Sequence, residues 1–290
     1  MNYYQKLKNE FKYGTTLHKL IYTNVIVYLI ILFIKILSNF IPEVNIITDY
    51  LVLPSNLTTL LHRPWTLLTY MFLHFDFIHI FFNLLVIYSF GNLFLYFFSQ
   101  RDLVAVYLLG GIVGGLLFIL YFNFFTPGIA ILIGASASAM AIILAIATYA
   151  PNYSFHLTLI GEVKAKYLAI FLVIIDLISV PAFNSGGHIA HIGGALFGFV
   201  YGYFYRKGKN IAKPFNNFLD KLVNLVKNRP TFNVTFNDNP KRPESDQDYR
   251  DRKAKEQEEL DKILKKIKLN GYNSLTENEK KQLFNASQKK

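Results

Sequence analysis

The sequence predicts an all-α membrane protein, in which a bundle of six transmembrane helices precedes a cytoplasmic C-terminal tail. Three observations predict this fold class. Apolar residues gather in blocks of about 20, the length a helix needs to cross the hydrocarbon core of a bilayer. Aromatic residues make up 16% of the chain, which suits the aromatic belts found at both membrane surfaces. Lysine and arginine are concentrated in alternate connections between the apolar blocks.

The chain begins with a basic segment, residues 1–16, that is expected to be cytoplasmic. The first apolar block follows at about residues 17–41, and it is too long to be the apolar part of a cleavable signal peptide. Residues 42–76 are too apolar to float in water, so we expect them to form short helices in the outer leaflet. A structureless loop of that length would be unusual in a compact domain.

Five further apolar blocks complete the predicted membrane domain, residues 17–206. They lie at about residues 77–98, 103–122, 131–150, 167–183 and 188–205. The connections after the second and fourth blocks carry lysine or arginine, whereas those after the third and fifth carry no charge. Because positive charge marks the cytoplasmic side, both termini are expected in the cytoplasm.

The chain becomes polar after residue 206. Residues 207–250 are predicted to be a linker, since their second half is rich in Asn, Pro, Asp and Arg. Residues 251–290 predict a short helical hairpin, with Gly271 as a C-cap and Ser274 to Glu277 as a capping box. Apolar side chains of its first helix share one face, namely Leu260, Ile263, Leu264 and Ile267. This tail either touches anionic lipid headgroups or is simply solvated.

Two of the apolar blocks carry small residues at every fourth position. One stripe consists of Ala137, Ala141 and Ala145, and the other of Ala190, Gly194, Gly198 and Gly202. Small residues at this spacing let membrane helices approach closely. We therefore expect these two helices to pack together, with Ser136 and His191 facing each other at their polar ends.

Polar side chains inside membrane helices are costly and indicate function. A serine hydroxyl is a poor nucleophile unless a base takes its proton, and His191 is the candidate base for Ser136. In the first turn of a helix, unpaired backbone N–H groups and the helix dipole would stabilise an oxyanion at Ser136. His79 and Asn83 lie one turn apart on one face and could add side-chain donors.

The same reasoning sets limits on the site. No carboxylate has an obvious place behind His191, which favours a Ser–His dyad over a three-residue arrangement. Gly134 would let the chain turn tightly before the nucleophile. Ser138 points about 200° away from Ser136 on a helix, so it is interpreted as a packing residue. Asp176 is interpreted as a neutral, hydrogen-bonded core acid.

These residues also carry a family resemblance. The segments Gly134-Ala-Ser136-Ala and Ala190-His191-Ile-Gly-Gly194-Ala-Leu-Phe-Gly198 resemble the paired motifs of rhomboid intramembrane serine proteases. The segment from His74 to Asn83 resembles the second-helix motif of that family, and Pro64-Trp65 resembles part of its first loop.

The resemblance implies Ser136 as nucleophile and His191 as general base. It implies an oxyanion hole made of His79, Asn83 and the backbone N–H of Ser136. The implied reaction is hydrolysis of peptide bonds in or next to transmembrane helices of membrane proteins, with the fifth block as a lateral gate. Two positions depart from the family pattern: Ala137 stands where glycine is usual, and Met140 where an aromatic residue is frequent.

Three alternatives stay open at this stage. A catalytically inactive relative would bind transmembrane clients without cutting them. A metal-dependent protease would use the histidines at positions 74, 79, 188 and 191, although the chain lacks an H-E-x-x-H motif. A transporter would be expected to show repeated halves, and no internal repeat is visible.

Composition narrows the expected partners. With no cysteine in the chain, disulfides and thiol nucleophiles are excluded. The net charge is +11, but the positively charged residues flank the apolar blocks or lie in the tail. This distribution does not favour a nucleic acid as the partner. The expected partners are therefore transmembrane protein substrates and membrane lipids, with no cofactor and no metal. The expected location is a bacterial inner membrane.

Overall fold

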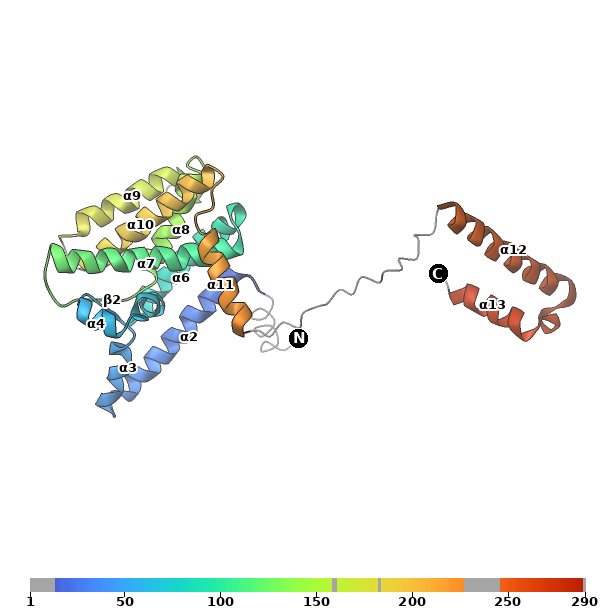
Figure 1. Ribbon diagram of the computed structural model, residues 1–290, viewed down its shortest axis with the longest axis horizontal. Coiled ribbons are helices and arrows are strands. Elements are labelled where there is room, and N and C mark those ends of the chain that lie inside the picture. The colour runs from blue at the N-terminus through green and yellow to red at the C-terminus, as the bar shows by residue number, and fades with distance from the viewer. Residues whose placement is uncertain (1–13, 158–160, 182–183, 227–245, 289–290) are drawn as a thin grey trace. The chain divides into compact units, whose positions relative to one another are not determined.

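The computed structural model describes residues 14–157, 161–181, 184–226 and 246–288. Its elements divide into two compact units, residues 1–228 and 229–290 (Figure 1). Every apolar block of the first unit forms a helix, as predicted. These helices are α2 (Thr16–Leu37), α6 (Phe77–Phe97), α7 (Gln100–Phe124), α8 (Ser136–Tyr149), α9 (Ala165–Ser179) and α10 (Ser185–Arg206).

Side-chain caps fix where several of these helices begin. The side chain of Asp76 accepts a hydrogen bond from the backbone N–H of His79 at 2.7 Å, which starts α6. Ser99 caps α7 in the same way through Asp102. Asn184 precedes α10 in the left-handed conformation, with φ +64°, and its side chain accepts from the N–H of Gly187. Each cap satisfies a donor that the helix itself leaves unpaired.

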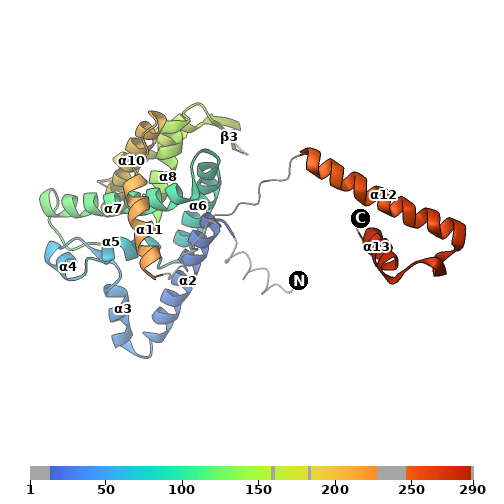
Figure 2. The same ribbon diagram turned by 45° about the vertical axis from the view of Figure 1, so that its right-hand side comes forward.

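Helix α8 is the centre of the first unit (Figures 1 and 2). All of residues 137–147 are buried, and the helix packs against α6, α7, α9 and α10. Its 14 residues rise about 21 Å at about 1.5 Å per residue, less than the roughly 30 Å of a hydrocarbon core. A helix enclosed by its neighbours in this way does not need to face lipid along its length.

Among the described residues, three helices are long and apolar enough to cross a membrane, namely α2, α6 and α7. Helix α8 is apolar but shorter, so the count of six spans stays a prediction. Large apolar side chains also lie exposed along α2, α6 and α9. They include Leu29, Phe33, Phe77, Phe81, Phe171 and Ile178. An apolar surface of this kind matches the interior of a bilayer rather than water.

The first long connection folds into short helices, as expected. They are η1 (Pro42–Asn45), α3 (Ile46–Asp49), α4 (Leu57–His62), α5 (Thr66–Thr69) and η2 (Tyr70–Phe72). The indole N–H of Trp65 donates to the carbonyl of Tyr50 at 2.7 Å. The guanidinium of Arg63 donates to the carbonyl of Asp49 at 2.9 Å and lies over the Tyr50 ring. These contacts fold the connection back on itself.

Two small strand pairs add to the predicted all-α fold. Strand β1 (Leu53–Pro54) pairs antiparallel with β2 (Ile131–Leu132), with Leu53 opposite Leu132. Strand β3 (Ser154–Leu157) pairs antiparallel with β4 (Gly161–Lys164). The first pair matters for the site, because it ties the segment that leads into α8 to the long connection.

Part of the predicted linker is a helix, α11 (Lys213–Val226). The amides of Asn210 and Asn216 both donate to one carboxylate oxygen of Asp102, at 2.8 and 3.1 Å. Arg101 pairs with Asp220 at 3.0 Å, and Ala212 joins the main core. The linker interpretation is therefore corrected for these residues, because they have buried and charged partners at the start of α7.

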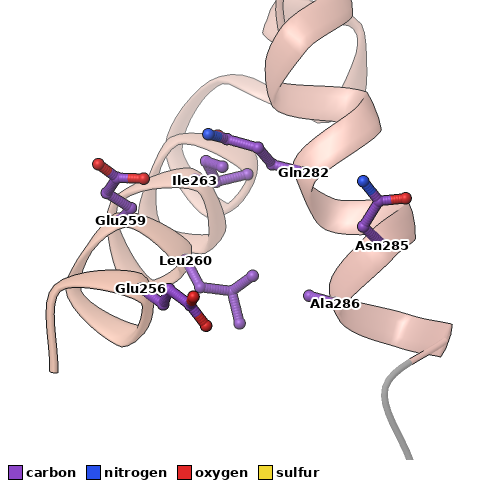
Figure 3. A pocket seen from close by; sticks show the side chains of 7 residues that line it. All are labelled: Glu256, Glu259, Leu260, Ile263, Gln282, Asn285 and Ala286. Carbon is purple, nitrogen blue, oxygen red and sulfur yellow. The ribbon is translucent and has the colours of Figure 1, made fainter. Parts of the chain in front are cut away.

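The second unit contains α12 (Asp246–Asn270), η3 (Tyr272–Ser274) and α13 (Glu277–Gln288). Leu260 and Ile263 of α12 point towards Gln282 and Ala286 of α13 (Figure 3). Gly271 ends α12 with φ +75°, and its N–H donates to the carbonyl of Ile267, as expected for a C-cap.

The capping box of α13 lies two residues later than predicted. The carboxylate of Glu279 accepts from the backbone N–H of Thr276 at 2.7 Å, and the N–H of Glu279 donates to the Thr276 hydroxyl at 3.4 Å. The capping box therefore pairs Thr276 with Glu279, whereas the sequence predicted a pairing of Ser274 with Glu277. Lys266 of α12 also pairs with Glu279 at 2.9 Å and joins the two helices.

Candidate active site

Ser136 is the first residue of α8, whereas the apolar block expected from the sequence begins at residue 131. Gly134, two residues earlier, has φ +109°, a conformation that side chains other than glycine rarely adopt. Its N–H donates to the carbonyl of Tyr70 at 2.9 Å. The N–H of Ala135 lies 3.5 Å from Nε2 of His74. These contacts, including the one to His74, hold the turn that precedes Ser136 at the helix start.

The candidate catalytic residues meet in one cavity of about 870 Å³. Helix α8 contributes Ser136 and Met140, α10 contributes His191, and α6 contributes His79 and Asn83. Among the described side chains, no hydrogen bond joins Ser136 to His191. Catalytic hydrogen bonds are often long in a free enzyme and tighten when substrate binds. The lack of a hydrogen bond between these two side chains is therefore compatible with a nucleophile and its base.

His79 and Asn83 lie on the cavity side of α6. A Cβ atom placed on Gly134 would be 2.8 Å from Nε2 of His79, so this ring lies directly against the loop before the serine. The His74 ring meets it edge-on, with centroids 5.0 Å apart. Asn83 donates one amide N–H to the carbonyl of His79 at 3.0 Å. Its side chain has a second N–H to offer to a ligand.

The two small-residue stripes meet as predicted. A Cβ atom added at Gly194 would overlap the carbonyl oxygen of Ala137, and one added at Gly198 would overlap that of Ala141. Gly202 faces Ala145 in the same way. The backbones of α8 and α10 are therefore in direct contact over two helical turns, which fixes the register of Ser136 against His191.

Ala137 stands where the family pattern usually has glycine, and its methyl group lies outside the cavity. Its methyl group lies against Gly114 of α7, where a Cβ would come within 2.7 Å of it. Ala137 is 2% exposed and does not line the cavity. The extra methyl is thus absorbed by a glycine on the neighbouring helix. Ser138 is fully buried near Gly111 of α7, which agrees with its interpretation as a packing residue.

The expectation that no carboxylate stands behind His191 is wrong. Oδ1 of Asp176, on α9, lies 2.9 Å from Nδ1 of His191 and 2.8 Å from Nδ1 of His188. Asp176 is 6% exposed. It is 15 residues from His191 in the sequence, and only the antiparallel packing of α9 against α10 brings the two together.

In the part of the chain that the structure describes, these three residues form a group that could hold a metal ion. Asp176, His188 and His191 each offer a ligand atom, and these atoms lie within 4.8 Å of one another. The distances from the carboxylate to both rings are those of hydrogen bonds. The four-histidine site weighed from the sequence is divided, because His74 and His79 contact each other whereas His188 and His191 share Asp176.

Two family models match the chain. One, described as a rhomboid domain, matches residues 61–208, about half of the chain, and includes every candidate site residue. The other, described as a family of unknown function (DUF6576), matches residues 244–289 of the second unit.

Two relatives carry similar sequences. The "Presenilin-associated rhomboid-like protein A, mitochondrial" of Danio rerio is 29% identical over 164 residues, which cover 55% of this chain and 42% of that protein. The "RHOMBOID-like protein 12, mitochondrial" of Arabidopsis thaliana is 28% identical over 165 residues, 51% of this chain and 48% of that protein. Each match thus spans less than half of the relative's length.

Proposed function

The chain belongs to the rhomboid family of membrane proteins, and we propose that it is an intramembrane serine endopeptidase. Its substrates would be membrane proteins cut in or next to a transmembrane helix. The observation that carries the proposal is the meeting of Ser136, at the start of α8, with His191 of α10 in one cavity. Hydrolysis by a serine nucleophile needs at least the serine and a general base such as histidine, and both residues line this cavity.

The proposed reaction runs in two steps. Oγ of Ser136 attacks the carbonyl carbon of the scissile peptide bond, and its proton passes to Nε2 of His191. The carbon–nitrogen bond then breaks, and the proton moves from His191 to the departing amine. In the second step His191 takes a proton from water, the hydroxide attacks the ester, and Ser136 recovers its proton as the acid product leaves.

The oxyanion of each tetrahedral intermediate needs hydrogen-bond donors. We assign this role to the backbone N–H of Ser136 and to the side chains of His79 and Asn83. Support comes from the position of Ser136 at the helix start, where backbone N–H groups are unpaired and the helix dipole favours negative charge. Further support comes from the two α6 side chains, which line the same cavity.

The walls of the cavity favour an apolar substrate segment. Besides the polar residues, it is lined by Ile78 and Phe82 of α6 and by Leu172 and Ile175 of α9. Ile78, Phe82 and Ile175 are largely exposed. We propose that a transmembrane substrate approaches between α6 and α9, with α9 as the movable wall.

The direct test is cleavage of a transmembrane reporter by the purified full chain in detergent. Ser136→Ala and His191→Ala are expected to abolish cleavage, whereas Ser138→Ala keeps it. The chelator EDTA is expected to change nothing, because no step uses a metal. Loss of activity in chelator would instead favour a metal-dependent reaction at the Asp176–histidine cluster. A folded wild-type protein that binds reporters without cutting them would favour the client-binding alternative.

We further propose that both termini lie on one side of the membrane and that the cavity opens towards the other. The pattern of lysine and arginine between the helices supports this sidedness. The bacterial inner membrane expected from the sequence has no support from the two relatives, whose names describe mitochondrial proteins.

A further inference from the structure

A buried carboxylate joins α9 to the proposed base on α10. We infer that Asp176 is a positioning residue that holds His191 in the orientation and tautomer needed to accept the proton of Ser136. The inference rests on the proposed function. It replaces a two-residue site with one in which a third side chain, from the helix proposed as the movable wall, prepares the base.

The tautomer follows from the chemistry of the partners. An ionised carboxylate can only accept hydrogen bonds, and its Oδ1 lies 2.9 Å from Nδ1 of His191. Nδ1 must therefore carry the hydrogen. In the neutral ring the other nitrogen, Nε2, then has a free lone pair. That nitrogen is the one available to a proton from Ser136 in the shared cavity.

The charge of Asp176 also favours the protonated base. When His191 takes the serine proton it becomes a cation, and an adjacent carboxylate stabilises that cation. The titratable groups that face His191 are Asp176 of α9, His188 of its own helix and His79 of α6. Helix α8 carries only Tyr149, at its far end. Asp176 is thus the one anionic group among these neighbours.

His188 anchors the carboxylate. It lies one turn before His191 on α10, and its Nδ1 is 2.8 Å from the same Oδ1. Two donors from one helix therefore fix the position of an oxygen that belongs to another helix. The role assigned to His188 is therefore to restrain Asp176, not to act on substrate.

The arrangement links the base to the position of α9. The buried residues of α9 are Ala165, Ala169 and Asp176, and Leu172 and Val173, which are partly buried, pack against the same apolar cluster as the two alanines. The outer face carries large exposed residues such as Phe171 and Ile178. If α9 swings away, His191 loses its partner, and the base is prepared again only when α9 returns.

The test compares Asp176→Asn with wild type in the reporter assay across a range of pH. We expect kcat to fall by about 10² to 10⁴-fold, as when the acid of a Ser–His–Asp triad becomes an amide, with KM little changed. The acidic limb of the kcat profile should move to lower pH, because a neutral amide no longer stabilises the protonated ring. Ser138→Ala is the control for a buried polar substitution nearby.

Two outcomes would overturn the inference. Wild-type kcat in Asp176→Asn would remove any role in positioning. A lower kcat with an unmoved acidic limb would reduce Asp176 to a tether between helices. In both cases Ser136→Ala and His191→Ala must still abolish cleavage. If those two variants cut normally, the proposed function itself fails.

A second measurement uses wild-type protein, in case Asp176→Asn does not fold. Nitrogen-15 spectra of histidine-labelled protein, with His191 assigned by comparison with His191→Ala, report which ring nitrogen carries the hydrogen. The inference predicts hydrogen on Nδ1 in the neutral ring. Hydrogen on Nε2 would contradict it, since that nitrogen could not then accept the serine proton.

Discussion

Ala137 of α8 and Gly194 of α10 are in backbone contact, so close that a Cβ atom on Gly194 would overlap the carbonyl oxygen of Ala137. Ala137 directly follows Ser136, and Gly194 lies one turn after His191. The contact that joins the two helices is therefore next to the two groups that the proposed reaction needs together. Packing at this point therefore sets how closely Ser136 and His191 can approach each other.

Gly194→Ala is expected to separate α8 from α10 and abolish cleavage. The added methyl meets backbone, which cannot swing aside as a side chain could, and such overpacking typically costs about 1–3 kcal/mol. Thermal unfolding and reporter cleavage measure both effects. Gly128→Ala is the matched control, because a Cβ there meets only a carbonyl oxygen at 3.8 Å. Equal behaviour of the two variants would contradict the packing argument.

Ala137 and Gly114 should behave as a coupled pair. Gly114→Ala would bring a new methyl within 2.7 Å of both the Ala137 methyl and the carbonyl oxygen of Ala190, so we expect clear destabilisation. Ala137→Gly alone should cost about 1 kcal/mol in helix propensity and keep activity. In the double variant the clash of methyls is gone, so the two effects should not add. Strict additivity in the unfolding free energies would argue against direct contact.

Asn83→Ala is expected to lower kcat by about 10²–10³-fold, the usual effect of removing one oxyanion donor. Asn92→Ala provides the control on the same helix, since the Asn92 amide also donates to the carbonyl four residues earlier, at 2.8 Å, but its side chain is exposed. Steady-state kinetics of both variants show whether the loss in kcat is specific to Asn83. A similar small loss in each would show that Asn83 serves only its own helix.

The stability of the helical hairpin in the second unit should depend on pH because of the ionisation of Glu279. The backbone N–H of Thr276, Lys266 and the Thr276 hydroxyl stabilise its ionised form and lower its pKa to about 2. A lowered carboxyl pKa contributes stability above the ordinary glutamate pKa, and that contribution disappears as the pH falls through the folded value. Glu279→Gln should therefore speed hydrogen exchange in residues 272–288 at pH 7 but not at pH 2.

The control for that experiment is Glu258→Gln. Glu258 is an exposed residue that pairs with Lys262 on the same helix, and exposed pairs of this kind contribute little. Its exchange should match wild type at both pH values. Faster exchange in Glu279→Gln at pH 2 as well would show that the effect is not due to the charge.

The sidedness proposed for the termini can be tested because the chain has no cysteine. Single cysteines at the exposed positions Thr58, on α4, and Lys209, after α10, should react from opposite sides of intact vesicles with a reagent that does not cross membranes. Reaction of both from the same side would contradict the predicted topology.

Local patterns predicted the helices and their closest contacts well. Apolar blocks located helices α2, α6, α7, α8, α9 and α10 of the first unit, and the spacing of Ala137 and Ala141 predicted their meeting with Gly194 and Gly198. Such patterns succeed because both partners carry the signal within their own helix. Residues 213–226 and the β1–β2 pair were missed because their partners lie far away in the sequence: Asp102 is 114 residues from Asn216, and Leu53 pairs with Leu132.

The contact between Asp176 and His191 was missed for a related reason, although one signal was present. Helix α9 ends at Ser179 and α10 begins at Ser185, so residues 176 and 188 lie equally far inside their helices. An antiparallel hairpin brings such residues together. A lone acid inside an apolar helix needs a partner, and this symmetry would have identified His188, with His191 one turn beyond.

The most direct test of the central claim is to find which atom a fluorophosphonate labels. Such reagents react with a serine whose oxygen is activated by a neighbouring base. Mass spectrometry of the labelled full chain should find one adduct, on Ser136, that disappears in His191→Ala and is undiminished in Ser138→Ala. An unlabelled wild-type protein that is folded, or an adduct on Ser138, would contradict the claim that Ser136 and His191 form a hydrolytic site.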